Sequence, residues 1–112
     1  MRGENLLETL RKENDNVSLK HDILQGKTIA VLVSGTNVHI GIANIFKGDQ
    51  LNRRKGRLIA LGRASHAKKV YNGQRQLRQR EQKRKEPLAF TIEGVGDVEK
   101  LVDDLFSGEF WK

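Results

Sequence analysis

The residues best suited to chemistry in this 112-residue chain are basic, and they crowd into residues 53–85. This segment holds thirteen arginines and lysines against one acid, Glu81, so its formal charge is +12. A planar guanidinium binds phosphate through two hydrogen bonds, and an ammonium binds it as a point charge. We therefore predict contacts with nucleic-acid phosphates or with an acidic partner. The residues expected to make them are Arg53, Arg54, Arg57, Arg63, Lys68, Lys69, Arg75, Arg78, Arg80, Lys83, Arg84 and Lys85.

The second half of this segment mixes arginine with glutamine, and Leu77 is its one apolar residue between Gln74 and Glu86. A basic helix of this composition can lie in a duplex groove or fold on RNA, with glutamine bonding to base edges. The alternative is a solvated linker, because the stretch has no apolar face to bury. We therefore expect residues 72–86 to form a basic exposed helix or linker, and the choice between DNA and RNA stays open.

Aromatic residues, which stack on bases in many single-strand binding proteins, are scarce in the basic region. Tyr71 is the one aromatic residue there, so the sequence gives base stacking little support. The remaining aromatic residues are expected to pack in the core. Phe110 and Trp111 lie after Gly108 at the end of the chain, where they either pack locally or form an exposed apolar docking patch.

Catalytic and metal sites find no support in the sequence. The chain has no cysteine, and its three histidines lack the spacing of metal ligands. Gly26, Lys27 and Thr28 resemble the end of a phosphate-binding loop, but the first glycine of that motif would fall at His21, and a strand follows instead of a helix. We therefore predict a protein that is not an enzyme and that holds no metal or cofactor.

A group of acids near the C-terminus is the remaining candidate for metal binding. Acids near a helix N-terminus are favoured by the helix dipole, so the simpler interpretation of this group is the solvent-exposed face of a helix. The group consists of Asp97, Glu99, Asp103 and Asp104.

Length and composition predict a single domain over residues 1–112 with a modest core. The chain is 37% hydrophobic and 31% charged, against averages of roughly 45–50% and 25% for globular proteins. Residues 1–52 carry six basic and six acidic side chains, whereas residues 86–112 carry two basic and seven acidic ones, a balance of −5. The first residues lack the apolar stretch of a secretory signal, and no run is long enough to span a membrane. We expect a cytoplasmic protein with no membrane contact.

Hydrophobic periodicity predicts an α+β fold, in which a small, mainly antiparallel sheet packs against two or three helices and leaves a basic segment exposed. A hairpin turn is expected at residues 34–37, and Gly41 suggests a bulge or a close backbone approach. The central helix should begin at Asp49 and bury Leu51, Leu58, Leu61 and Ser65. Asn72 and Gly73 should follow its end. The expected helices are residues 4–12, 49–69 and 97–106, and the expected strands are residues 17–21, 28–33, 38–46 and 88–92.

Residues 48–64, with the sequence GDQLNRRKGRLIALGRA, resemble a segment of small uncharacterised proteins of bacteriophages and mobile elements. In those proteins, as predicted here, the segment follows a strand. The resemblance implies a phage-type accessory protein that acts in the cytoplasm of a bacterial host. It implies no catalytic residues.

Two functions follow from these patterns. The first is a non-enzymatic module that binds DNA or RNA through the basic helix and the arginine-rich segment. The alternative is an anti-CRISPR-like inhibitor of a host nucleoprotein or defence complex, which would act by protein–protein contact and use Phe110 and Trp111 as apolar anchors. The sequence leaves the oligomeric state open.

Overall fold

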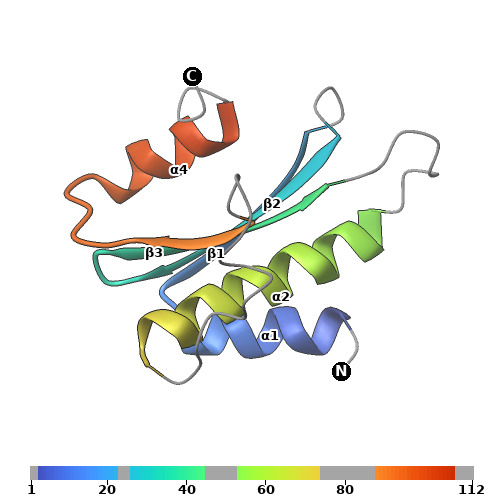
Figure 1. Ribbon diagram of the computed structural model, residues 1–112, viewed down its shortest axis with the longest axis horizontal. Coiled ribbons are helices and arrows are strands. Elements are labelled where there is room, and N and C mark those ends of the chain that lie inside the picture. Colours follow the sequence, from blue (N-terminus) through green and yellow to red (C-terminus); the bar gives the residue numbers. More distant parts are fainter. Residues whose placement is uncertain (1–2, 23–25, 45–52, 74–87, 108–112) are drawn as a thin grey trace.

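A computed structural model describes residues 3–22, 26–44, 53–73 and 88–107 of the chain. These residues form a four-stranded antiparallel sheet in the order β1-β2-β3-β4, accompanied by three helices (Figure 1), which confirms the predicted α+β fold. No helix in the described part of the chain has both the length and the apolar character needed to cross a membrane. The elements are α1 (Gly3–Glu13), β1 (Asn16–Asp22), β2 (Lys27–Ser34), β3 (Asn37–Asn44), α2 (Arg53–Tyr71), β4 (Ala89–Ile92) and α4 (Val98–Ser107).

The β2–β3 hairpin is the centre of the sheet. Its two strands pair from Lys27↔Asn44 to Ser34↔Asn37, and the first residue of the tight turn between them, Gly35, has a positive φ of 62°. Positive φ carries little steric cost for glycine because it lacks a Cβ. Six consecutive residues of each strand are buried, because helices cover both faces of the sheet. The hairpin was predicted correctly.

The sheet is the middle of three layers (Figure 1), with α1 and α2 on one face and α4 on the other. The core on the α2 face combines alanines from the sheet and the helix with Leu10, Leu32 and Leu61. The core beneath α4 contains larger side chains, including Ile29, Ile40 and the fully buried Leu105. The two sides of one sheet are therefore packed differently.

Gly41 brings α2 unusually close to β3. A Cβ built on Gly41 would lie 2.1 Å from the carbonyl oxygen of Ala60 and 2.3 Å from the backbone nitrogen of Ala64, so no larger residue fits without moving the helix. The pairing of β2 with β3 runs through Gly41 without interruption. Of the two expectations for this glycine, the close backbone approach is therefore correct and the bulge is wrong.

The buried face of α2 differs from the predicted one. Leu61 is buried as expected, but Leu58 and Ser65 are only half-buried, and Leu51 lies outside the described residues. At this short distance from the sheet only small side chains fit between the helix and β3, so the side of α2 that faces the sheet consists of glycine and alanine and not of the predicted residues. The residues facing the sheet are Gly56, Ala60, Ala64 and Ala67.

The ends of the helices largely agree with the predictions. Asn72 and Gly73 follow α2, and Gly73 has a positive φ of 76°. Asp97 caps α4, since its Oδ1 accepts a hydrogen bond of 3.0 Å from the backbone nitrogen of Lys100. The predicted start of the central helix at Asp49 lies outside the described residues.

Candidate nucleic-acid interface

Helix α2 carries the described part of the basic region. It contains seven arginines and lysines and no acid. Because alanine and glycine occupy its sheet-facing side, most of its circumference remains for long polar side chains. Three of the seven cations, Lys55, Arg57 and Lys69, are exposed. The side chains of Arg53 and Arg54, at its first turn, lie outside the described part of the structure.

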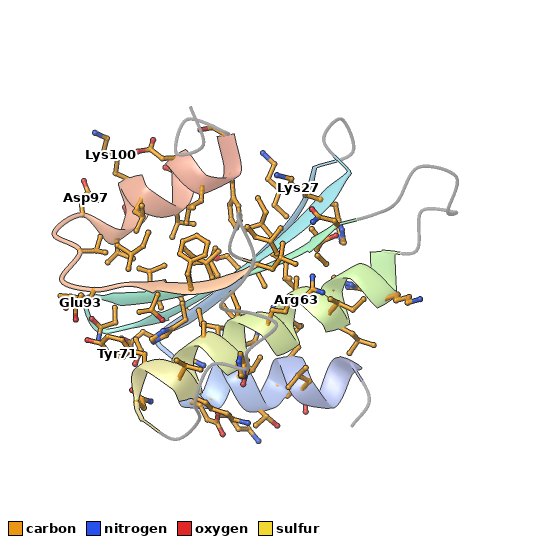
Figure 2. All side chains as sticks on the ribbon, in the orientation of Figure 1. Lys27, Arg63, Tyr71, Glu93, Asp97 and Lys100 are labelled. Atoms are coloured by element: carbon orange, nitrogen blue, oxygen red, sulfur yellow. The ribbon has the colours of Figure 1, made fainter. Side chains whose placement is uncertain are left out.

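Arg63 has a structural partner in the sheet. Its side chain is half-buried, and Nη1 donates a hydrogen bond of 2.6 Å to the carbonyl oxygen of Ile42 in β3 (Figure 2). The backbone nitrogen of Ile42 donates to the carbonyl oxygen of Leu88 just before β4. Arg63 therefore supplies a donor where β3 extends beyond β4, and this contact fastens α2 to the sheet.

Lys68 has a comparable role toward α1. Its Nζ donates to the side-chain oxygen of Asn14 at 2.8 Å and to the carbonyl oxygen of Glu13 at 3.2 Å. The buried Asn14 side chain in turn donates to the carbonyl oxygen of Leu10 at 2.7 Å. Cations are favoured near the carbonyl end of a helix. Lys68 thus stabilises the end of α1, and it remains a predicted contact to a partner.

Acidic side chains lie on the opposite face of the sheet. In α4 and its cap, Asp97, Glu99 and Asp103 are exposed, and Lys100 is the one cation of that helix (Figure 2). Among the described residues, no group of three or more His, Cys, Asp or Glu side chains is arranged to hold a metal ion. Three of the four acids thus lie on the solvent-exposed side of α4, whereas Asp104 is half-buried, and the sheet separates them from the cations of α2.

A polar cluster lies at the C-terminal end of α2. The hydroxyl of Tyr71 donates a hydrogen bond of 2.8 Å to Oε2 of Glu93, and Figure 2 shows the two side chains next to each other. The Tyr71 ring also leans on the ring of His39, with centroids 5.7 Å apart and planes tilted by 57°. The bond to Glu93 raises the pKa of the Tyr71 hydroxyl, so the hydroxyl remains a donor. The end of α2, strand β3 and the residue that follows β4 thus meet at this aromatic side chain.

His39 is the buried member of this cluster. It is 1% exposed, and its Nδ1 lies 2.7 Å from the hydroxyl oxygen of Thr91. The Thr91 hydroxyl donates to the carbonyl oxygen of Ala67 at 3.4 Å, which leaves its oxygen to accept from Nδ1. Burial lowers the pKa of His39 to about 4, and the charge of Lys68 contributes to the shift. His39 is therefore neutral at physiological pH.

The other two histidines lie in regular secondary structure. His21 lies in β1, and its Nδ1 is 2.8 Å from the hydroxyl of the buried Thr28. His66 is half-buried on α2. Neither belongs to a described metal-binding group.

Sequence reasoning missed two features of this face. Lys55 was counted in the basic segment but was not among the expected contacts, although its side chain is exposed in the first part of α2. The cluster of His39, Tyr71 and Glu93 had no recognisable pattern, because its members lie 32 and 22 residues apart in sequence.

The remaining predicted site residues are not covered by the structure. They lie in the arginine-rich segment and at the end of the chain, outside the described residues, and they stay predictions. They are Arg75, Arg78, Arg80, Lys83, Arg84, Lys85, Phe110 and Trp111.

Comparisons of the chain with models of protein families, with curated proteins and with solved structures found no match.

Proposed function

We propose that this chain is a small, non-enzymatic, phage-type accessory protein that binds DNA or RNA through the outer surface of α2 and the arginine-rich segment 75–85. The observation that carries the proposal is the separation of charge across the sheet: α2 has seven cations and no acid, whereas the exposed acids of α4 lie on the opposite face. Such a distribution gives the molecule a positive side that attracts polyanions and a negative side that repels them.

Two exposed lysines of α2, Lys55 and Lys69, lie on nearly the same side of the helix, because fourteen residues make about four turns, and they are placed to follow a phosphate backbone. Lys55 and Lys69 are fourteen residues apart, which is about 21 Å along a helix at about 1.5 Å per residue. A strand of B-DNA has one phosphate per roughly 3.4 Å of helix axis, so this length corresponds to several phosphates. Arg57 is also exposed, but it lies two residues from Lys55 and therefore faces a different side of the helix.

The test is a fluorescence-anisotropy titration of single-stranded RNA, single-stranded DNA and duplex DNA over a salt series. The first variant replaces Lys55, Arg57 and Lys69 with alanine, and the second replaces Arg75, Arg78, Arg80 and Arg84. If each exposed cation neutralises one phosphate, the first variant should flatten the slope of log K against log salt for the duplex by up to about three. Arg63 and Lys68 are left intact because they fasten the fold.

A matched control separates local contacts from net charge. Arg11, Lys12 and Lys100 are exposed cations outside α2. Replacing them with alanine lowers the net charge by three, as the α2 variant does. The proposal expects this control to bind much more tightly than the α2 variant. Equal weakening of both variants would indicate attraction to net charge alone, and no detectable binding of the intact protein at low salt would refute the proposal.

The resemblance of residues 48–64 to proteins of phages and mobile elements supports a second candidate. In this function the protein inhibits a host nucleoprotein or defence complex, its arginines bind an acidic protein surface or a guide RNA, and Phe110 and Trp111 provide apolar contact. A pull-down from nuclease-treated bacterial extract should then retain a specific protein. Loss of all bound material on nuclease treatment would count against this candidate.

A further inference from the structure

We propose that Tyr71 stacks against an unpaired nucleobase, so that the preferred ligand of the outer surface of α2 is single-stranded nucleic acid or a single-stranded loop. This inference rests on the proposed nucleic-acid function. It concerns a residue that the sequence alone did not favour for this role.

Exposure is the first observation. Tyr71 is 42% exposed, and it is one of two large apolar side chains that are exposed among the described residues. The other, Ile59, is aliphatic and has no π-face. Aromatic rings stack on every type of base, so an exposed ring beside phosphate-binding cations can add affinity without sequence preference.

The second observation is that the ring is held in place. Its hydroxyl is bonded to Glu93, and the ring leans on His39, which is itself buried and bonded to Thr91. Binding to a ring that is already ordered costs less side-chain entropy than binding to a mobile one. The contacts leave part of the ring exposed while they fix its orientation.

The position of Tyr71 gives the third observation. It is the last residue of α2, two residues after the exposed Lys69, and the arginine-rich segment follows it in sequence. A strand whose phosphates follow the outer surface of α2 reaches Tyr71 by turning around the end of the helix. There the Glu93 carboxylate repels a phosphate, whereas a neutral base has no charge to be repelled.

These features favour a single strand over a duplex. The bases of a duplex are stacked on each other, and their faces are not available to a side chain, whereas unpaired bases can be splayed out onto an aromatic ring. The phosphate contacts of α2 are common to both ligands. The contribution of Tyr71 should therefore appear only with unpaired bases.

The experiment compares a single-stranded oligonucleotide with a fully abasic strand of the same length and charge, each titrated with the intact protein and with Tyr71→Leu. Stacking predicts that the intact protein binds the base-bearing strand about tenfold more tightly than the abasic strand. Tyr71→Leu should abolish most of this difference, with little effect on duplex binding or on the salt slope, because no phosphate contact is lost. Tyr71→Phe keeps the ring and should stay within about threefold of the intact protein.

The outcomes separate this inference from the proposed function. If the intact protein binds strands and duplexes in a salt-dependent way but Tyr71→Leu keeps the full preference for base-bearing strands, the function stands and the stacking role is wrong. Equal losses in Tyr71→Phe and Tyr71→Leu would also overturn stacking, since the hydroxyl would then be the important group. If the intact protein binds no nucleic acid, both proposals fail. The base-bearing and abasic strands can also be compared with the intact protein alone. If the intact protein binds the two strands with equal affinity, the inference is overturned even when Tyr71→Leu does not fold.

Discussion

The two faces of the sheet bury their helices in different ways. Helix α2 approaches β3 so closely that backbone meets backbone at Gly41, and alanines occupy most of the contact. Helix α4 packs on a layer of isoleucine, valine, leucine and phenylalanine side chains, and its own Leu105 is fully buried in that layer. A helix that packs through small residues needs only a narrow part of its surface for the core. The difference explains how α2 can carry seven cations and still belong to the fold.

Gly41 is the position where we expect a substitution to have the largest effect on stability. Replacing it with alanine places a methyl group about 2 Å from the backbone of α2, and a helix backbone cannot move aside as a flexible side chain can. We expect the free energy of unfolding to fall by about 4 kcal/mol, above the usual cost of overpacking. Chemical denaturation monitored by circular dichroism measures the change.

Gly62 is the matched control for this substitution, because it is an exposed glycine on the same helix with no heavy atom within 4 Å of a built Cβ. Gly62→Ala should stabilise the protein by up to about 1 kcal/mol, as expected for replacing glycine in a helix. Similar effects at the two positions would contradict the close packing of α2 on β3.

On the other face, Leu105→Ala should create a cavity beneath α4 and lower the free energy of unfolding by about 3 kcal/mol, within the range for buried leucines. Leu105→Met, which conserves volume, should cost less than about 1.5 kcal/mol. Under conditions where the alanine variant remains folded, its affinity for nucleic acid should equal that of the intact protein, because the cations of α2 lie on the opposite face. A parallel loss of affinity would show that the two faces are not independent.

The pH dependence of stability should also arise from the α2 face, where His39 is buried. The pKa of His39 is about 4 in the folded protein and 6.5 in an unfolded chain, so the unfolded chain binds a proton first as pH falls. The stability associated with neutral His39 is present above pH 6.5 and is lost between pH 6.5 and about 4. We expect a loss of about 2 kcal/mol between pH 7 and pH 5.

Denaturation curves at several pH values measure this loss, and His39→Gln provides the comparison. The glutamine variant should be less stable at pH 7 but should show a flatter dependence between pH 7 and pH 5. An unchanged pH dependence in His39→Gln would mean that another group is responsible.

Several features of this protein followed from local sequence. The strands have β-branched residues in runs that are bounded by turn residues, Gly35 marks the hairpin, and Asp97 caps the last helix. Each of these depends on neighbours in the chain, so the α+β fold could be predicted. The concentration of positive charge in residues 53–85 is likewise a property of the sequence alone.

Only the tertiary structure decided which residues of the basic helix face the sheet and which face solvent. The periodicity of leucines suggested a buried face containing Leu58, but the close approach at Gly41 selects alanines instead. Arg63 and Lys68 were indistinguishable in sequence from Arg57 and Lys69, yet the first two bond to the backbone of β3 and to the end of α1. Such contacts join residues far apart in the chain, and their geometry is set by strand pairing and helix packing. For the same physical reason, the meeting of Tyr71, His39 and Glu93 was beyond the reach of local patterns.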